Sequence, residues 1–86
     1  MSYELAFTVE AEADLKSLDK TTARRILKKL QQVSEYEDVA HILKPLTGTW
    51  SEYSRIRVGS YRVICRVSGE QLVVHRLRKR SRVYRA

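Results

Sequence analysis

The strongest constraint on the fold is a two-residue alternation of side chains on both sides of Gly59-Ser60. Over residues 53–58, basic or aromatic positions alternate with small or aliphatic ones, and residues 61–67 alternate again after the turn. A period of two is typical of a β-strand with one buried face. Glycine at the first central position suits a type II′ hairpin turn. The pattern therefore predicts two antiparallel strands, 53–58 and 61–67, joined by a two-residue turn.

Closing this turn fixes which residues lie opposite each other. The predicted pairs are Val58 with Tyr61, Arg57 with Arg62, Ile56 with Val63, Arg55 with Ile64, and Tyr53 with Arg66. One face then carries Arg55, Arg57, Arg62 and Arg66, and the other carries Ile56, Val58, Val63, Cys65 and Val67. Like charges directly opposite each other destabilise a sheet. We therefore expect the arginine face to receive phosphate and the aliphatic face to pack on helices.

A third strand is expected at residues 72–77, after a turn at Ser68-Gly69. A two-residue turn would place His75 beside Arg62, whereas one additional loop residue would place Arg76 there. A β-bulge would re-aim the positions beyond it. The pattern thus brings Arg76 and Arg78 near the arginine face without fixing their sides.

The first part of the chain predicts a short strand followed by two helices. Residues 3–8 alternate loosely, and Thr8 and Asp19 are suitable N-caps for the helices after them. The apolar stripes of these helices are Ala11, Leu15 and Leu18, then Ala23, Ile26, Leu27, Leu30 and Val33. The opposite side of the second helix, with Arg24, Arg25, Lys28 and Lys29, is expected to be a solvated face. Residues 35–52 show no regular period and are expected to form a loop.

This order of elements predicts a single α+β domain over residues 1–86, in which a helical hairpin packs on a small antiparallel sheet. A chain of 86 residues leaves no room for a second domain. The one cysteine, Cys65, is expected in the core and excludes an internal disulfide or a cysteine-based zinc site. We expect no cofactor, no metal and no membrane segment. The sequence shows no signal peptide, and we expect a cytoplasmic protein.

Positive charge is concentrated in the second half of the chain. Residues 44–86 contain eleven basic and two acidic residues, whereas residues 1–43 have a net charge of −2. A half-domain with a net charge of +9 calls for a polyanion or an acidic partner. Near its end, Tyr84 lies among arginines, and an aromatic ring among cations suits single-stranded nucleic acid. A basic terminus that Tyr84 anchors to the sheet is the alternative.

The run YSRIRVGSYRVI at residues 53–64 resembles the signature of the RelE/ParE superfamily of bacterial toxins. So do LKPLTG at residues 43–48 and SRVYR at residues 81–85. The resemblance covers essentially the whole chain and implies a RelE-like, microbial-ribonuclease-like fold. RelE-like members are ribosome-dependent endoribonucleases that cut mRNA in the A site, whereas ParE-like members poison DNA gyrase. The resemblance also implies a toxin of a type II toxin-antitoxin module, with a cognate antitoxin and the ribosome with its mRNA as partners.

The resemblance assigns site residues by position. The expected catalytic residues are Arg55, Arg57, Arg62, Arg78 and Tyr84. RNA contacts are expected from Lys44, Arg66, Arg76, Lys79, Arg80, Arg82 and Arg85. Lys79 stands where many relatives have a histidine, so a mechanism for this chain should not depend on that group.

The inventory of residues favours cleavage without metal. Glu52 and Glu70 are the only carboxylates after residue 43, so a two-metal nuclease site is not expected. The 2′-OH of RNA supplies the nucleophile, arginines stabilise the charged phosphorane, and Tyr84 acts as base or orienting group. Two alternatives stay open: a gyrase inhibitor on the same fold, and an RNA-binding module that does not cut.

Overall fold

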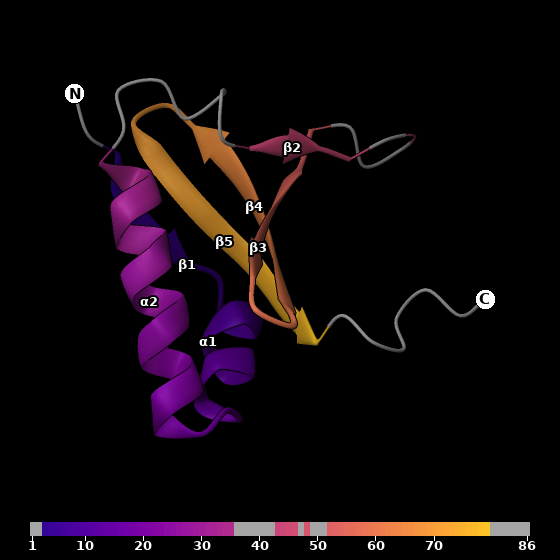
Figure 1. Ribbon diagram of the computed structural model, residues 1–86. Helices are drawn as coiled ribbons and strands as arrows, with labels where there is room; N and C mark the ends of the chain where they lie inside the picture. The colour runs from indigo at the N-terminus through magenta and orange to yellow at the C-terminus, as the bar shows by residue number, and fades with distance from the viewer. Residues whose placement is uncertain (1–2, 36–42, 47, 49–51, 80–86) are drawn as a thin grey trace.

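The computed structural model describes residues 3–35, 43–46, 48 and 52–79, and shows two helices on one side of a five-stranded sheet (Figure 1). In chain order the elements are β1 (Glu4–Phe7), α1 (Val9–Lys16), α2 (Lys20–Ser34), β2 (Lys44–Pro45), β3 (Ser54–Val58), β4 (Tyr61–Ser68) and β5 (Gln71–Lys79). The strands are arranged in the order β1-β5-β4-β3-β2. The predicted α+β architecture is confirmed. In the described part of the chain, no helix is long and apolar enough to cross a membrane.

Two features of the sheet differ from the expected one. β2 to β5 are antiparallel neighbours, but β1 joins the edge parallel to β5, with Phe7 opposite Val74. The sheet is therefore mixed: the chain passes through α1, α2 and three further strands before β5 pairs with β1 in parallel. The second difference is β2, which lies within the segment expected to be a loop and pairs Lys44 with Arg55.

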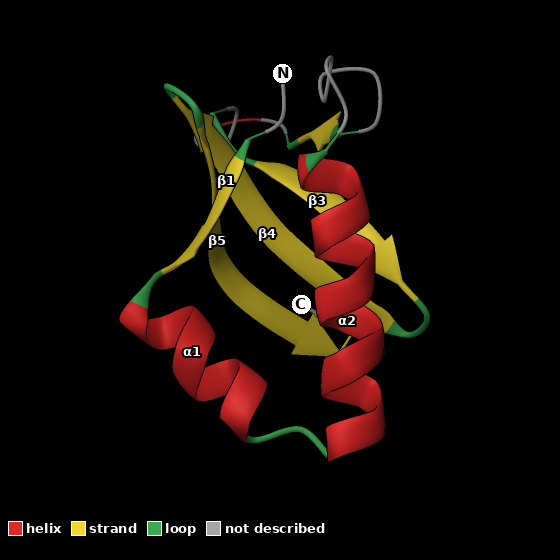
Figure 2. Cartoon of the chain, turned by 90° about the vertical axis from the view of Figure 1, so that its left-hand side faces the viewer, coloured by secondary structure: helices red, strands yellow, loops and turns green. Residues whose placement is uncertain are grey.

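Both helices begin at the predicted caps. The Thr8 hydroxyl accepts a hydrogen bond from the Ala11 amide at 3.1 Å, and the Asp19 carboxylate accepts one from the Thr22 amide at 3.1 Å. These side chains satisfy amides that the first turn of a helix leaves without partners. In Figure 2 the two helices diverge from their short connection at residues 17–19.

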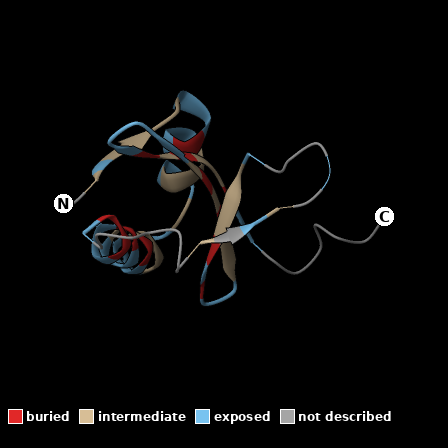
Figure 3. Cartoon of the chain, turned by 90° about the horizontal axis from the view of Figure 1, so that it is seen from above, coloured by how far each residue is buried: buried red, intermediate tan, exposed pale blue. Residues whose placement is uncertain are grey.

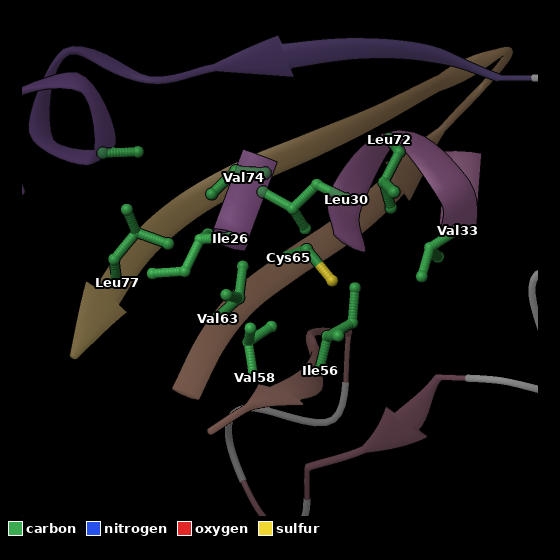
Figure 4. Packing of buried hydrophobic residues seen from close by; sticks show 11 residues of the cluster. Ile26, Leu30, Val33, Ile56, Val58, Val63, Cys65, Leu72, Val74 and Leu77 are labelled. Carbon is green, nitrogen blue, oxygen red and sulfur yellow. The ribbon is translucent and has the colours of Figure 1, made fainter. Parts of the chain in front are cut away.

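The core lies between the helices and the aliphatic face of the sheet. Figure 4 shows Ile26 and Leu30 of α2 beside Val63 and Cys65 of β4 and Val74 of β5. Seen from above, the buried part of α2 lies on its side toward the strands (Figure 3). Burial raises the pKa of the Cys65 thiol to about 12, so this side chain packs as a small hydrophobe, as predicted. Val67, expected on the same face, is 38% exposed at the end of β4.

The β3–β4 hairpin has the predicted register. Val58 lies opposite Tyr61, Arg57 opposite Arg62, and the pairing continues to Ser54 with Cys65. Gly59 has a φ of 59°, and no non-glycine residue in the described part of the chain has a positive φ. A left-handed residue only at the first central position is the geometry of the predicted type II′ turn.

The register of β5 corrects both alternatives for the third strand. Ser68 pairs with Gln71, so the turn is formed by Gly69-Glu70 rather than Ser68-Gly69. A bulge then shifts the register between Ile64 and Cys65, leaving His75 as the additional residue. As a result Arg62 lies opposite Arg78, and neither His75 nor Arg76 occupies that position.

The bulge is held by Thr8, the N-cap of α1, and by Asp14 within that helix. The Thr8 hydroxyl donates a hydrogen bond to the His75 carbonyl at 3.0 Å. Asp14 accepts hydrogen bonds from Arg76 Nε at 2.8 Å and from the Leu77 amide at 2.9 Å. Partial burial would raise the pKa of Asp14, but these hydrogen bonds and the charges of Arg76 and Arg78 bring this pKa below its ordinary value. One carboxylate thus fixes both the backbone and a side chain beyond the bulge.

We expect Asp14→Ala to lower the free energy of unfolding by about 1–3 kcal/mol, because the Leu77 amide and Arg76 lose their acceptor. Glu12→Ala, an exposed change on the same helix, is the control and should change it by no more than about 0.5 kcal/mol. Urea unfolding at several pH values measures both.

Because the pKa of Asp14 is lower in the folded protein than in the unfolded chain, its charge stabilises the fold at pH values above the unfolded pKa. The loss of unfolding free energy in Asp14→Ala should therefore be complete above about pH 4. It should shrink as the pH falls through the lowered pKa of Asp14. A deficit that is independent of pH down to acid unfolding would contradict the role given to its charge.

Candidate functional site

Three arginines on adjacent strands lie directly opposite one another on the sheet face that points away from the helices. Arg57 of β3 pairs with Arg62 of β4, and Arg62 pairs with Arg78 of β5. We call these three residues the arginine row. Arg57 lies between the buried Ile56 and Val58, so strand alternation directs it away from the core. Sequence reasoning paired the first two members of the row, and the bulge supplies the third.

The arginine row concentrates positive charge where a sheet normally avoids it. Arg57 and Arg78 are exposed and Arg62 is half-buried, and the row itself contains no carboxylate. Opposed like charges cost folding free energy, which a bound anion would offset. Guanidinium groups offer planar pairs of donors that match the oxygens of a phosphate. The row is therefore suited to bind a phosphodiester and to stabilise additional negative charge on it.

Arg55 extends the site toward the edge of the sheet. It is half-buried, two residues before Arg57 on β3, and lies opposite Ile64 on one side. On its other side, the register of β2 places the backbone of Lys44 opposite Arg55. Arg55 thus lies two residues from the row along β3, and its role in binding phosphate stays a prediction.

Two other predicted arginines already have acidic partners. Arg76 is paired with Asp14 at 2.8 Å, and this contact raises the pKa of its guanidinium. Arg66 lies 3.3 Å from Glu52, with its guanidinium 5.8 Å from the centre of the Tyr53 ring. The Arg66–Glu52 pair is well exposed, so it contributes little stability and remains open to exchange for another anion.

The remaining predicted site residues are not on this face or are not described. Lys79 is exposed and lies opposite Tyr61, on the side of β5 that carries Leu77 and faces the helices. Arg80, Arg82, Tyr84 and Arg85 lie outside the described residues. Their roles therefore stay predictions.

A second basic surface adjoins the row across the edge of β3. A hollow of about 360 Å³ lies between α2 and the β3–β4 turn. Its lining is Arg25, Lys28, Lys29, Gln32, Arg57, Val58 and Gly59. We call it the basic groove. Three of the four basic residues that were expected to form a solvated helix face line this groove, and Arg57 belongs to both the groove and the arginine row. Sequence reasoning did not find it because the groove joins segments about thirty residues apart.

The described residues include no group of three or more histidine, cysteine or acidic side chains placed to hold a metal ion.

Sequence reasoning also did not predict the role of Asp14 or the contact between Tyr53 and His75. Asp14 gave no signal because acidic residues are ordinary in the first turns of a helix. The predicted pairing with Arg66 places Tyr53 on the arginine face. Its contact with His75 could not be predicted, because the bulge decides where His75 lies.

Comparison with solved structures finds this fold in chains of toxin-antitoxin complexes. The RelBE2 toxin-antitoxin complex from Mycobacterium tuberculosis contains a chain with 24% sequence identity and a TM-score of 0.83, covering 94% of each chain. An archaeal RelE–RelB complex from Pyrococcus horikoshii gives 28% identity and a TM-score of 0.70, covering 95% of this chain and 99% of that one. A chain of the chromosomal ParDE system from P. aeruginosa gives 14% identity and a TM-score of 0.71, covering 91% and 96%.

Residues 5–84 match the family model described as the ParE toxin of the type II toxin-antitoxin system parDE, and the chain belongs to this family. The resemblance to the RelE/ParE superfamily is thereby confirmed. A search of curated proteins gave no match.

Proposed function

We propose that this toxin is a ribosome-dependent endoribonuclease that cuts mRNA in the A site without a metal ion. The observation that carries the proposal is the arginine row, which continues across three strands and has Arg55 beside it. A single phosphate bound at Arg62 would meet guanidinium groups from both neighbouring strands. Such preorganised charges stabilise a transition state that gains negative charge.

In the proposed reaction, the 2′-oxygen attacks the adjacent phosphorus and the bond from phosphorus to the 5′-oxygen breaks. The 2′-OH loses its proton to the phenolate of Tyr84 or to water oriented by Tyr84, and the 5′-oxygen takes a proton from solvent water as it leaves. Arg55, Arg57 and Arg62 hold the phosphate, and Arg78 neutralises the leaving oxygen. The products are a 2′,3′-cyclic phosphate and a 5′-OH. The base is weak, so positioning of the mRNA by the ribosome has to supply much of the rate.

The proposal includes two partners. The first is a cognate antitoxin, supported by the family's place in toxin-antitoxin systems and by the antitoxin complexes among the solved structures. The second is the ribosome, for which the basic groove supplies a surface that adjoins the site of cutting and shares Arg57 with it. The lysines and arginines of the groove would contact the phosphate backbone of ribosomal RNA. The site of action would be the cytoplasm.

A gyrase inhibitor is the second candidate, because the matching family model describes ParE toxins and a ParDE chain shares the fold. Primer extension on an mRNA translated with the purified toxin tests the first candidate, and a gyrase supercoiling assay tests the second. New mRNA ends in frame with codons, with supercoiling unaffected, support the ribonuclease. Inhibited supercoiling without new mRNA ends overturns it in favour of gyrase.

We expect the double variant Lys28→Glu/Lys29→Glu to weaken binding to ribosomes, because both residues line the basic groove. The slope of log affinity against log salt concentration should become shallower by about one for each phosphate that the variant no longer binds. The double variant Lys20→Glu/Arg24→Glu makes the same change of net charge on the same helix outside the groove lining and should weaken binding less. Sedimentation with ribosomes at several salt concentrations measures both. An equal weakening in the two proteins would point to net charge rather than to the groove.

A further inference from the structure

A second hollow lies on the same sheet face as the arginine row, toward α1. Its volume is about 320 Å³, at the lower end of ligand pockets, and it is lined by Glu10, Tyr53, Ile64, His75 and Arg76. Ile64 is two residues from Arg62 on β4, a distance of about 6.6 Å along a strand. A group in this hollow would therefore lie next to a phosphate held by the arginine row.

The walls of the hollow include two aromatic rings, an aliphatic side chain and a planar guanidinium. The Tyr53 and His75 rings meet edge to face, with centroids 4.9 Å apart and planes at 88°. Ile64 contributes an aliphatic surface, and Asp14 holds the planar guanidinium of Arg76 in place. Aromatic rings and guanidinium planes are the surfaces on which unpaired bases stack.

One carboxylate also lines the hollow. Glu10 is exposed in the first turn of α1, and its charge acts on both His75 and Arg76. Burial lowers the pKa of His75, as does the charge of Arg66, although Glu10 opposes them. The lowered pKa favours the uncharged form of the His75 ring. A carboxylate accepts hydrogen bonds only, so at the position that it contacts it favours an amino group over a carbonyl oxygen.

We propose that this hollow binds the base adjacent to the scissile phosphate and prefers a base with an exocyclic amino group, which donates to Glu10. The proposal rests on the proposed ribonuclease function and adds a determinant of where the toxin cuts. Tyr53, His75 and Arg76 hold the plane of the base, and Glu10 reads its edge. Cytosine and uracil are the sharpest comparison, because they differ at the position where cytosine has an amino group and uracil has an oxygen.

The binding experiment uses nucleotides and does not depend on cleavage. Ring resonances of His75 are followed by NMR while cytidine 5′-monophosphate, uridine 5′-monophosphate or ribose 5-phosphate is added to the purified chain. We expect the cytidine nucleotide to bind about fivefold to tenfold more tightly than the uridine nucleotide. Ribose 5-phosphate should leave His75 unshifted. Equal affinity for the two nucleotides would overturn the proposal.

The matched variants are Glu10→Gln and Glu12→Gln, which make the same change on α1 inside and outside the hollow. The first should abolish the preference for cytidine over uridine, and the second should retain it. Sequencing the 5′ ends of cleaved mRNA should show the same change of preference at the cut.

The outcomes separate the two proposals. Cleavage with an unchanged base preference in Glu10→Gln overturns the base site and leaves the ribonuclease function standing. Selective binding of the cytidine nucleotide by a wild-type chain that cuts no mRNA retains the base site and overturns the ribonuclease function.

Discussion

Arg62→Ala should lower the rate of mRNA cleavage on programmed ribosomes by about 10²–10³, the reduction typical of removing one preorganised stabiliser of negative charge. Arg62 is the central member of the arginine row and lies opposite Arg57 on one side and Arg78 on the other. A phosphate placed there has no central guanidinium to bind in the variant. Single-turnover cleavage with saturating toxin measures the chemical step apart from ribosome binding.

Two companion variants make the result specific. Arg62→Lys retains the charge but not the planar pair of donors, so its rate should lie between those of wild type and Arg62→Ala. Arg24→Ala removes an exposed arginine on α2, outside the row and the groove lining, and should cut at nearly the wild-type rate. Thermal melting of each protein shows whether the fold is retained. Wild-type cleavage by a folded Arg62→Ala protein would exclude the arginine row as the site.

The hairpin shows why part of this site is readable from sequence. A two-residue turn and a period of two leave one register that buries the aliphatic residues, so the pairing of Arg57 with Arg62 follows from local rules. The helix caps at Thr8 and Asp19 are equally local, because each side chain bonds to an amide three residues ahead.

The third member of the row depends on contacts that no local pattern contains. Arg78 reaches Arg62 because β5 has a bulge at His75, and the bulge is held by Thr8 and Asp14, more than sixty residues earlier. The parallel pairing of β1 with β5 and the pairing of the short β2 with β3 also have no local sequence signal. Sequence reasoning therefore predicted the register and the arginine face of the hairpin, while tertiary contacts decided the side of Arg76, Arg78 and Lys79.

The fold alone does not separate the two activities of this superfamily. Chains from RelE and ParDE systems share the architecture, with TM-scores of 0.70 and 0.71 for the Pyrococcus horikoshii and P. aeruginosa chains. An activity has to be argued from the site rather than from the scaffold. The arginine row favours chemistry on a phosphodiester, and the variants of Arg62 test it directly. A second test concerns proton transfer, which arginines perform poorly because they stay charged.

Tyr84→Phe should lower the cleavage rate by about 10²-fold or more if its hydroxyl transfers or orients the proton of the 2′-OH. Tyr84 lies outside the described residues, and its role rests on the superfamily resemblance and on the arginines around it in the sequence. The change removes one oxygen and retains the ring. For a tyrosine that only anchors the terminus, or only stacks on a base, the same change would therefore be nearly silent.

The measurement is single-turnover cleavage on programmed ribosomes for wild type, Tyr84→Phe and Tyr61→Phe, with thermal melting alongside. Tyr61 is the matched control, since it lies on the helix side of β4, and removal of its hydroxyl should leave the cleavage rate close to wild type. Tyr84→Ala removes the ring as well, so a further decrease beyond Tyr84→Phe measures stacking separately from proton transfer. Unchanged cleavage in Tyr84→Phe would remove Tyr84 from the catalytic residues and leave water as the base beside the arginine row.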